Sequence, residues 1–160
     1  GHFIGKFGKT VKDNLKRLNF DAIQHACFVP GSNRIWVCFR NRYDLRCYKN
    51  KKPIIEIRER DDFFALEEKM IMGKKIKMPK DRAVHVAYAN DRLYFFYLIV
   101  GDQTSFCDIF ELKKYSLVKR IKLKYNYRRF THAGENRFYG LAYDKNEDHD
   151  ILLTKIELKN

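Results

Sequence analysis

The sequence has few of the residues that divide or interrupt a domain. Its 160 residues include only 3 prolines and 8 glycines, and no stretch has the composition of a flexible linker. It also lacks an apolar run of the roughly 18–20 residues that a membrane-spanning helix needs. The longest apolar run, residues 93–100, has the length of a buried strand. We therefore expect one globular domain, residues 1–160, without a membrane span.

The motifs of common catalytic and metal sites are also missing. No G-x-S-x-G, H-E-x-x-H or P-loop pattern occurs, so we expect no catalytic residue and no cofactor. The acidic segment 144–150 lacks the spacing of an EF-hand, and we expect a solvated hairpin tip there.

The four cysteines, Cys27, Cys38, Cys47 and Cys107, form no C-x-x-C pair, which argues against a zinc site. A hairpin over residues 34–49 could place Cys38 opposite Cys47 and allow a disulfide. Buried free thiols are the alternative, and the redox state stays open.

Positive charge is abundant. The chain has 33 Lys and Arg against 20 Asp and Glu, a net charge of +13, and 45% of its residues are hydrophobic. This balance favours acidic partners such as nucleic acid, anionic lipid or polysaccharide. A solvated surface is the alternative, because the basic residues are spread along the chain and alternate with apolar ones.

A short phrase occurs three times, at residues 33–37, 91–95 and 136–140. Each copy has a turn residue, an arginine, an apolar residue and an aromatic one, and each opens a run with strand propensity. The copies are 58 and 45 residues apart (91 − 33 and 136 − 91). Periods near 40–50 residues are typical of propellers and solenoids.

The strands and turns around these copies predict an all-β fold of antiparallel four-stranded meanders, arranged as β-propeller blades. The first blade is expected at about 22–58, the second at about 83–123, and the third at about 130–158. The third blade has one strand too few, and a strand at 2–8 would complete it, because the last residue followed by Gly1 gives the Asn-Gly pair of a tight hairpin.

Between the first two blades, residues 61–81 are expected to hold a helical insertion. Asp61 or Asp62 can cap a helix over residues 63–72, and Gly73 can end it. The apolar side of this helix would pack on the blades or, because it contains methionine, bind a partner.

Residues 1–8, Gly-His-Phe-Ile-Gly-Lys-Phe-Gly, resemble the outer-strand phrase of NHL-type and TolB-like six-bladed β-propellers. The resemblance implies a binding or interaction module, often located in the bacterial periplasm or at the cell surface, and supplies no catalytic residues. Three blades do not close a ring. Either a homodimer completes six blades, or the chain is half of a longer protein with blades upstream, or a flatter β-sandwich imitates blades.

The expected first strand of each blade contains one histidine, His25, His85 or His132. In a propeller these strands line the central channel, so the three imidazoles are candidates for a polar lining or for a metal site, with unrelated packing as the alternative. The recurring arginines, Arg34, Arg92 and Arg137, would project from one rim and could bind carboxylates or phosphates.

Basic residues alternate with tyrosines between 119 and 129, a pattern that can bind polyanions and stack bases. The candidates are Lys119, Arg120, Lys122, Lys124, Tyr125, Tyr127, Arg128 and Arg129. A charged outer strand that blunts an exposed edge is the alternative. The cluster Lys74, Lys75, Lys77 and Lys80 has the same two interpretations.

The sequence therefore favours a non-enzymatic binding module for a protein or carbohydrate partner. A basic nucleic-acid or polyanion-binding protein is the first alternative. A propeller enzyme that uses the channel histidines is the second.

Overall fold

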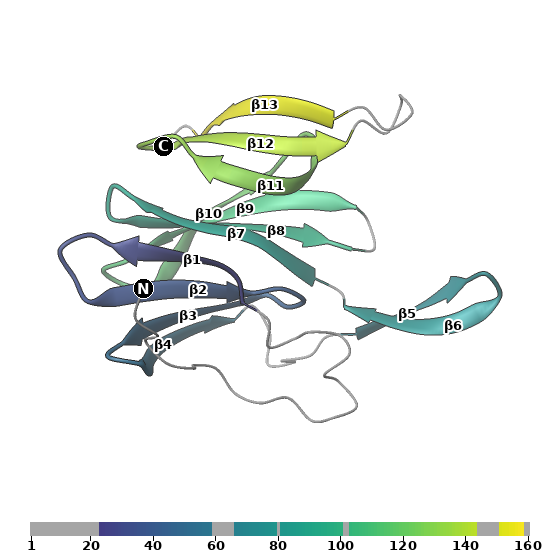
Figure 1. Ribbon diagram of the computed structural model, residues 1–160, viewed down its shortest axis with the longest axis horizontal. Coiled ribbons are helices and arrows are strands. Elements are labelled where there is room, and N and C mark those ends of the chain that lie inside the picture. Colours follow the sequence, from purple (N-terminus) through teal and green to yellow (C-terminus); the bar gives the residue numbers. More distant parts are fainter. Residues whose placement is uncertain (1–22, 59–65, 80, 101–102, 144–150, 159–160) are drawn as a thin grey trace, which may run out of the picture.

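The computed structural model describes residues 23–58, 66–79, 81–100, 103–143 and 151–158 (Figure 1). In these ranges all regular secondary structure is β, which confirms the predicted all-β class but not the helix predicted between the first two blades. No helix that could cross a membrane is found among them. The strand predicted at 2–8 and the acidic segment 144–150 lie outside the described residues.

Three antiparallel sheets follow one another along the chain. The first consists of β1 (Ile23–Val29), β2 (Arg34–Phe39), β3 (Asp44–Lys49) and β4 (Lys52–Arg58), and the second of β7 (Asp81–Ala89), β8 (Arg92–Ile99), β9 (Thr104–Glu111) and β10 (Ser116–Lys122). The third contains β11 (Asn126–His132), β12 (Arg137–Tyr143) and β13 (Ile151–Glu157), and a separate hairpin pairs β5 (Leu66–Ile71) with β6 (Lys74–Pro79). The sheets are meanders, as predicted, although β11 begins four residues before the expected start at 130 (130 − 126).

Two-residue turns close several of the hairpins. Asn50 and Lys51 have φ of 50° and 66°, and Asn90 and Asp91 have φ of 50° and 57°. Two successive positive φ values define the type I′ turn, whose twist matches that of the flanking strands, and Asn and Asp tolerate this conformation. These turns therefore help to set the registers of the β3–β4 and β7–β8 pairs.

The helix predicted over 63–72 is wrong from Leu66 onwards, and residues 63–65 lie outside the described part. β5 and β6 form a hairpin that projects away from the stacked sheets (Figure 1). Met72 and Gly73 close it with φ of 51° and 74°, and Glu68 lies opposite Lys77 with their charged atoms 4.0 Å apart. A glycine with positive φ ends helices and closes hairpins alike, so Gly73 did not distinguish the two structures.

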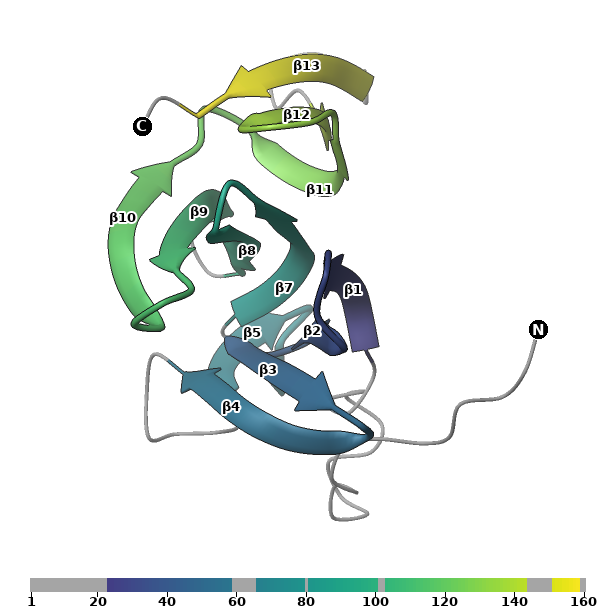
Figure 2. The same cartoon turned by 90° about the vertical axis from the view of Figure 1, so that its left-hand side faces the viewer.

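The three sheets lie side by side like successive propeller blades (Figures 1 and 2). Their first strands β1, β7 and β11 are neighbours, with β7 between the other two. The last strands, β4, β10 and β13, lie on the outside (Figure 2). This arrangement brings the first strands of the three sheets together.

Apolar side chains join the first sheet to the second. One buried cluster contains Trp36, Cys38, Leu45 and Cys47 from the first sheet and Leu93, Phe95 and Tyr97 from β8. Tyr43, in the turn before β3, meets the rings of Phe95 and Tyr97 edge-on, each at a centroid distance of 4.9 Å. Burial of large apolar side chains contributes about 1.5–3 kcal/mol each, so this cluster holds the two sheets together.

The opposite face of β8 packs against the third sheet. Phe96 stacks on Phe130 with ring centroids 4.1 Å apart and meets Phe138 edge-on at 4.8 Å. Tyr94 contacts the same Phe138 at 5.3 Å. The second sheet is therefore apolar on both faces, and the alternating residues of β8 divide between two interfaces.

The corresponding face of the third sheet is open. Tyr139 and Leu141 stand two and four residues after the arginine that opens β12, as Tyr94 and Phe96 do in β8. Their exposed fractions are 45% and 37%, whereas those of Tyr94 and Phe96 are 1% and 0%. Among the described residues the stack of sheets therefore ends in an uncovered apolar face, which also includes Ile151 and Leu153.

Cys38 and Cys47 are free and buried. Cys38 pairs with Leu45 and Cys47 with Trp36, so the two thiols are not directly opposite each other on β2 and β3. Burial raises the pKa of both thiols. The predicted alternative of buried free thiols is the one that the structure has.

Gly140 is required by a close approach inside the third sheet. A Cβ atom at this position would lie 2.5 Å and 2.6 Å from two ring carbons of Tyr127, and 3.2 Å from Ile156. The Thr154 hydroxyl donates to the Tyr127 hydroxyl oxygen at 2.8 Å, which helps to hold the ring over Gly140.

We expect Gly140→Ala to lower the free energy of unfolding by about 1–3 kcal/mol, because the added methyl group overpacks the contact with Tyr127. Urea unfolding of both proteins measures the change. In a Tyr127→Ala background the same substitution should lower the free energy of unfolding much less, because the Tyr127 ring is absent. An equal cost in both backgrounds would show that the ring contact is not the cause.

Candidate functional site

Each of the three first strands contains a β-bulge at the same place. The bulge residues are Gln24 in β1, Val84 in β7 and Arg128 in β11, where the pairing register shifts. A bulge bends its strand and re-aims the side chain of the extra residue. All three bulge residues line one pocket between the sheets.

The bulges are in register with the recurring arginines. In every sheet, the residue after the bulge pairs with the residue four positions after the arginine that opens the second strand. The three pairs are His25 with Cys38, His85 with Phe96 and Arg129 with Leu141. His25 and His85 are therefore structurally equivalent, whereas Arg129, not His132, takes this position in the third sheet.

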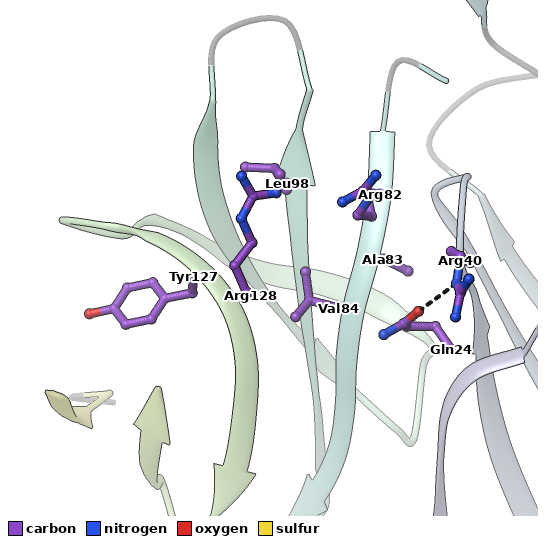
Figure 3. Close-up of a pocket in the computed structure, with 8 residues that line it drawn as sticks. All are labelled: Gln24, Arg40, Arg82, Ala83, Val84, Leu98, Tyr127 and Arg128. Atoms are coloured by element: carbon purple, nitrogen blue, oxygen red, sulfur yellow. Dashed lines mark hydrogen bonds between the residues drawn. The ribbon is translucent and has the colours of Figure 1, made fainter. Parts of the chain in front are cut away.

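The pocket at the bulges has a volume of about 260 Å³, and we call it the arginine pocket because Arg40, Arg82 and Arg128 line it (Figure 3). Arg40 follows β2, Arg82 lies in β7 and Arg128 in β11. In the view of Figure 3, Arg82 lies between the other two. The other lining residues are Gln24, Ala83, Val84, Leu98 and Tyr127, so none of the eight is acidic.

The three guanidinium groups repel one another. Burial, together with the positive charges of Arg128 and Arg40, lowers the pKa of Arg82. Arginine nevertheless stays protonated at neutral pH, because its ordinary pKa is so high. The arginine pocket therefore concentrates positive charge, and a bound anion would reduce the electrostatic repulsion among its guanidinium groups.

Amide side chains orient two of these arginines. Arg40 Nε donates to Gln24 Oε1 at 3.2 Å, and a terminal nitrogen of Arg128 donates to Gln103 Oε1 at 3.4 Å. The Asn126 amide donates to the same Gln103 oxygen at 2.7 Å. Amide oxygens accept hydrogen bonds without cancelling charge, so these contacts position the guanidinium groups.

A second pocket, of about 370 Å³, lies further along the same strands. We call it the histidine pocket because His25, His85 and His132 all line it. The rings of His25 and His85 lie against each other with centroids 3.8 Å apart. The structure thus brings together the three histidines that the sequence singled out, although only two of them occupy equivalent positions.

The hydrogen bonds of these histidines define which ring nitrogens carry protons. His25 Nδ1 lies 3.0 Å from the carbonyl oxygen of Val86, and His132 Nε2 lies 2.8 Å from that of Glu135. A carbonyl oxygen only accepts, so each of these nitrogens donates, and the other nitrogen of the neutral ring is an acceptor. His85 Nε2 is buried and has no hydrogen-bond partner.

The two equivalent histidines are neutral at neutral pH. Burial, and to a smaller extent the neighbouring His25 and His132, lowers the pKa of His85 to about 3. Burial also lowers the pKa of His25, against the hydrogen bond to Val86 that raises it. Within the described ranges no group of three or more His, Cys, Asp or Glu side chains is arranged to hold a metal ion, so the metal alternative gains no support.

The recurring arginines lie at the other end of the strands. Arg34, Arg92 and Arg137 each begin a second strand, at the turns on the left of Figure 1. Arg34 donates to the Tyr115 hydroxyl at 3.2 Å and so links the first two sheets. These residues do not meet the arginine pocket.

The basic segment 119–129 does not form one surface. Arg120 makes two hydrogen bonds, of 2.9 Å and 2.8 Å, to the buried Asp108 carboxylate. Tyr127 is buried, Lys124 lies over the Tyr125 ring at 4.9 Å, and Arg128 enters the arginine pocket. The predicted alternation of cations and stacking rings is therefore divided among different environments.

Sequence reasoning missed Arg40 and Arg82. Both stand at the strand ends opposite the recurring arginines, one just after β2 and one at the start of β7. A search for cations at that end of the predicted meanders would have found them. Their convergence with Arg128 depends on how the sheets pack.

We expect the free energy of unfolding to fall as the pH drops below 6.5. The pKa of His85 is about 3 in the folded protein against 6.5 in an unperturbed chain. Between these two pKa values the unfolded state binds a proton that the folded state does not. The free energy of unfolding therefore rises with pH in this range, and His85 adds no further pH dependence above it. One such group gives a slope of at most about 1.4 kcal/mol per pH unit.

Urea unfolding at pH 7 and pH 5 measures this effect, and His85→Leu should reduce the difference between the two pH values. Carboxylates titrate in both proteins, so the comparison isolates His85. The same pH dependence in both proteins would contradict the assignment.

No known protein family matches the chain, and no curated protein matches it. Among solved structures it is similar to Kluyveromyces lactis Hsv2, with 11% identity and a TM-score of 0.37 over 85% of this chain and 37% of that one. A form of KlHsv2 with loop 6CD replaced by a Gly-Ser linker is 11% identical, with a TM-score of 0.37 over 85% of this chain and 40% of that one. A form with the complete loop 6CD is 10% identical, with a TM-score of 0.36 over 85% of this chain and 36% of that one. The chain thus spans about two fifths of these proteins, at similarities too low to assign a family or a function.

Proposed function

We propose that the chain is a non-enzymatic binding module whose arginine pocket holds an anionic group of its ligand. The observation that carries the proposal is the convergence of Arg40, Arg82 and Arg128 in a pocket where none of the described lining residues is acidic. Three like charges held together destabilise the free protein, and such an arrangement is common where a ligand supplies the opposite charge.

The chemistry of the pocket favours a carboxylate or a phosphate. A guanidinium group presents a planar set of donors that matches the oxygens of either anion, and its hydrogen bonds to them are charge-assisted. Val84 and Leu98 form apolar parts of the wall, which lowers the local dielectric constant and strengthens each charged contact.

A compact anionic group fits better than a long nucleic acid. Binding of single-stranded nucleic acid relies on successive exposed aromatic rings along a basic groove. Tyr127 is buried, and Arg120 is paired with Asp108. The charge is therefore gathered at one pocket instead of spread along a stacking surface.

The sequence-based interpretation fits inside this proposal. The protein or carbohydrate partner that the sequence favours would supply the anionic group. The likeness of residues 1–8 to NHL-type and TolB-like propellers leads us to propose that the three sheets belong to a six-bladed ring with its binding sites near the channel.

Calorimetric titration of the protein with inorganic phosphate and with citrate at low salt tests the proposal. Arg128→Ala and Arg82→Gln are each expected to weaken binding about tenfold or more, because each removes charge-assisted hydrogen bonds. Arg82→Gln should also raise the melting temperature of the free protein, since it relieves the repulsion that lowers the pKa of Arg82.

Arg137→Ala is the matched control, because it makes the same change in net charge at the other end of the strands. It should leave the binding of both anions unchanged. An equal loss in this control would show that the net charge of +13 attracts anions without a site. Absence of binding by both anions would contradict the proposal.

A further inference from the structure

The histidine pocket continues the arginine pocket along β7. Ala83 and Val84 line the first pocket, and the next four residues of the strand, 85–88, line the second. β1 on one side and β11 on the other contribute residues to both pockets. At about 3.3 Å per residue, the stretch from 83 to 88 is about 17 Å long, which a di- or trisaccharide can span.

We propose that the ligand is an acidic carbohydrate, whose phosphate or carboxylate lies in the arginine pocket and whose sugar rings lie in the histidine pocket. This inference rests on the proposed function, because it places the anionic group at the same three arginines. It adds the chemical class of the rest of the ligand.

The histidine pocket offers hydrogen-bond acceptors. His25 Nδ1 and His132 Nε2 donate to backbone carbonyl oxygens, so the other nitrogen of each ring can accept from a ligand when it carries no proton. A ligand that fits must therefore carry donors, and sugar hydroxyl groups are donors that also accept. The Thr131 side chain, which lines the same pocket, can exchange hydrogen bonds with such hydroxyls in either direction.

His85 supplies a second, independent observation. Its exposed fraction is 5%, and its Nε2 atom has no hydrogen-bond partner. Buried polar groups in folded proteins are nearly always satisfied, so an unsatisfied one in a pocket wall calls for an explanation. Nε2 is itself enclosed, so the neighbouring side chains would have to shift for a ligand hydroxyl to reach this nitrogen and satisfy it.

Aromatic side chains complete the pocket. Phe130 and Tyr88 line it, and Phe28 lines it with 68% of its surface exposed. Large aromatic residues are usually more buried than this. A pyranose ring has apolar C–H faces and a polar rim, so it matches a wall that combines aromatic faces with a few hydrogen-bonding groups.

Calorimetry with four probes tests the inference: inorganic phosphate, trehalose, trehalose 6-phosphate and digalacturonate. Trehalose 6-phosphate or digalacturonate should bind about tenfold or more tightly than phosphate, because the sugar adds hydrogen bonds in the histidine pocket. The tighter of the two identifies the anionic group as phosphate or carboxylate. Trehalose alone should bind weakly, since it lacks the charged group.

Variants of the histidine pocket separate the two parts of the ligand. His132→Ala should weaken binding of the acidic sugars about tenfold and leave that of inorganic phosphate unchanged. Arg128→Ala should weaken all anionic probes. His85→Leu is a second variant of the histidine pocket with the same expectation as His132→Ala, and melting curves establish that each variant is folded.

The outcomes distinguish this inference from the proposed function. If phosphate binds at the arginine pocket but the acidic sugars bind no more tightly, and His132→Ala has no effect on them, the carbohydrate inference is wrong and the proposed function stands. Tighter binding of triglutamate than of both acidic sugars would replace it with an acidic peptide. If no anionic probe binds, both are wrong.

Discussion

The pairing of the first strand with the second, in the same register in each sheet, is the constraint on which the rest of the structure depends. The bulges at Gln24, Val84 and Arg128 fall at one level of that register. Because side chains alternate along a strand, a shift of one residue would exchange the two faces of β8. It would disrupt the packing of the second sheet against both the first and the third. The common register also aligns the first strands, so that side chains from three sheets meet in the same two pockets.

The arginines of this molecule occupy two different kinds of environment. The buried Asp108 accepts hydrogen bonds from Arg120 and Tyr43, and the buried Asp44 accepts from Arg46, so these cations are neutralised within the fold. Removing one partner of such a pair would leave an uncompensated buried charge, which costs several kcal/mol. None of the described residues that line the arginine pocket is acidic, and the convergence of three guanidinium groups there is why we assign it to ligand binding.

Local signals predicted most of the strands. Asn and Asp at the turns, aromatic and β-branched residues in the runs between them, and the recurring arginine were sufficient for the meanders. The same reasoning failed at residues 66–72, where both a helix and a hairpin suit the pattern and the chain forms a hairpin with Glu68 opposite Lys77. Histidine offsets measured along the sequence concealed that His25 and His85 are equivalent, because turn lengths differ between the sheets.

By itself, the sequence determined the all-β class, the order of the meanders and the three histidines of the first strands, because these depend on residue preferences within a few positions of each other. Only the tertiary structure decided that Arg40, Arg82 and Arg128 converge and that His85 is buried next to His25. Arg40 and Arg128 are 88 residues apart (128 − 40) and belong to different sheets. Their proximity comes from the packing of aromatic faces between sheets, and no local preference encodes that packing.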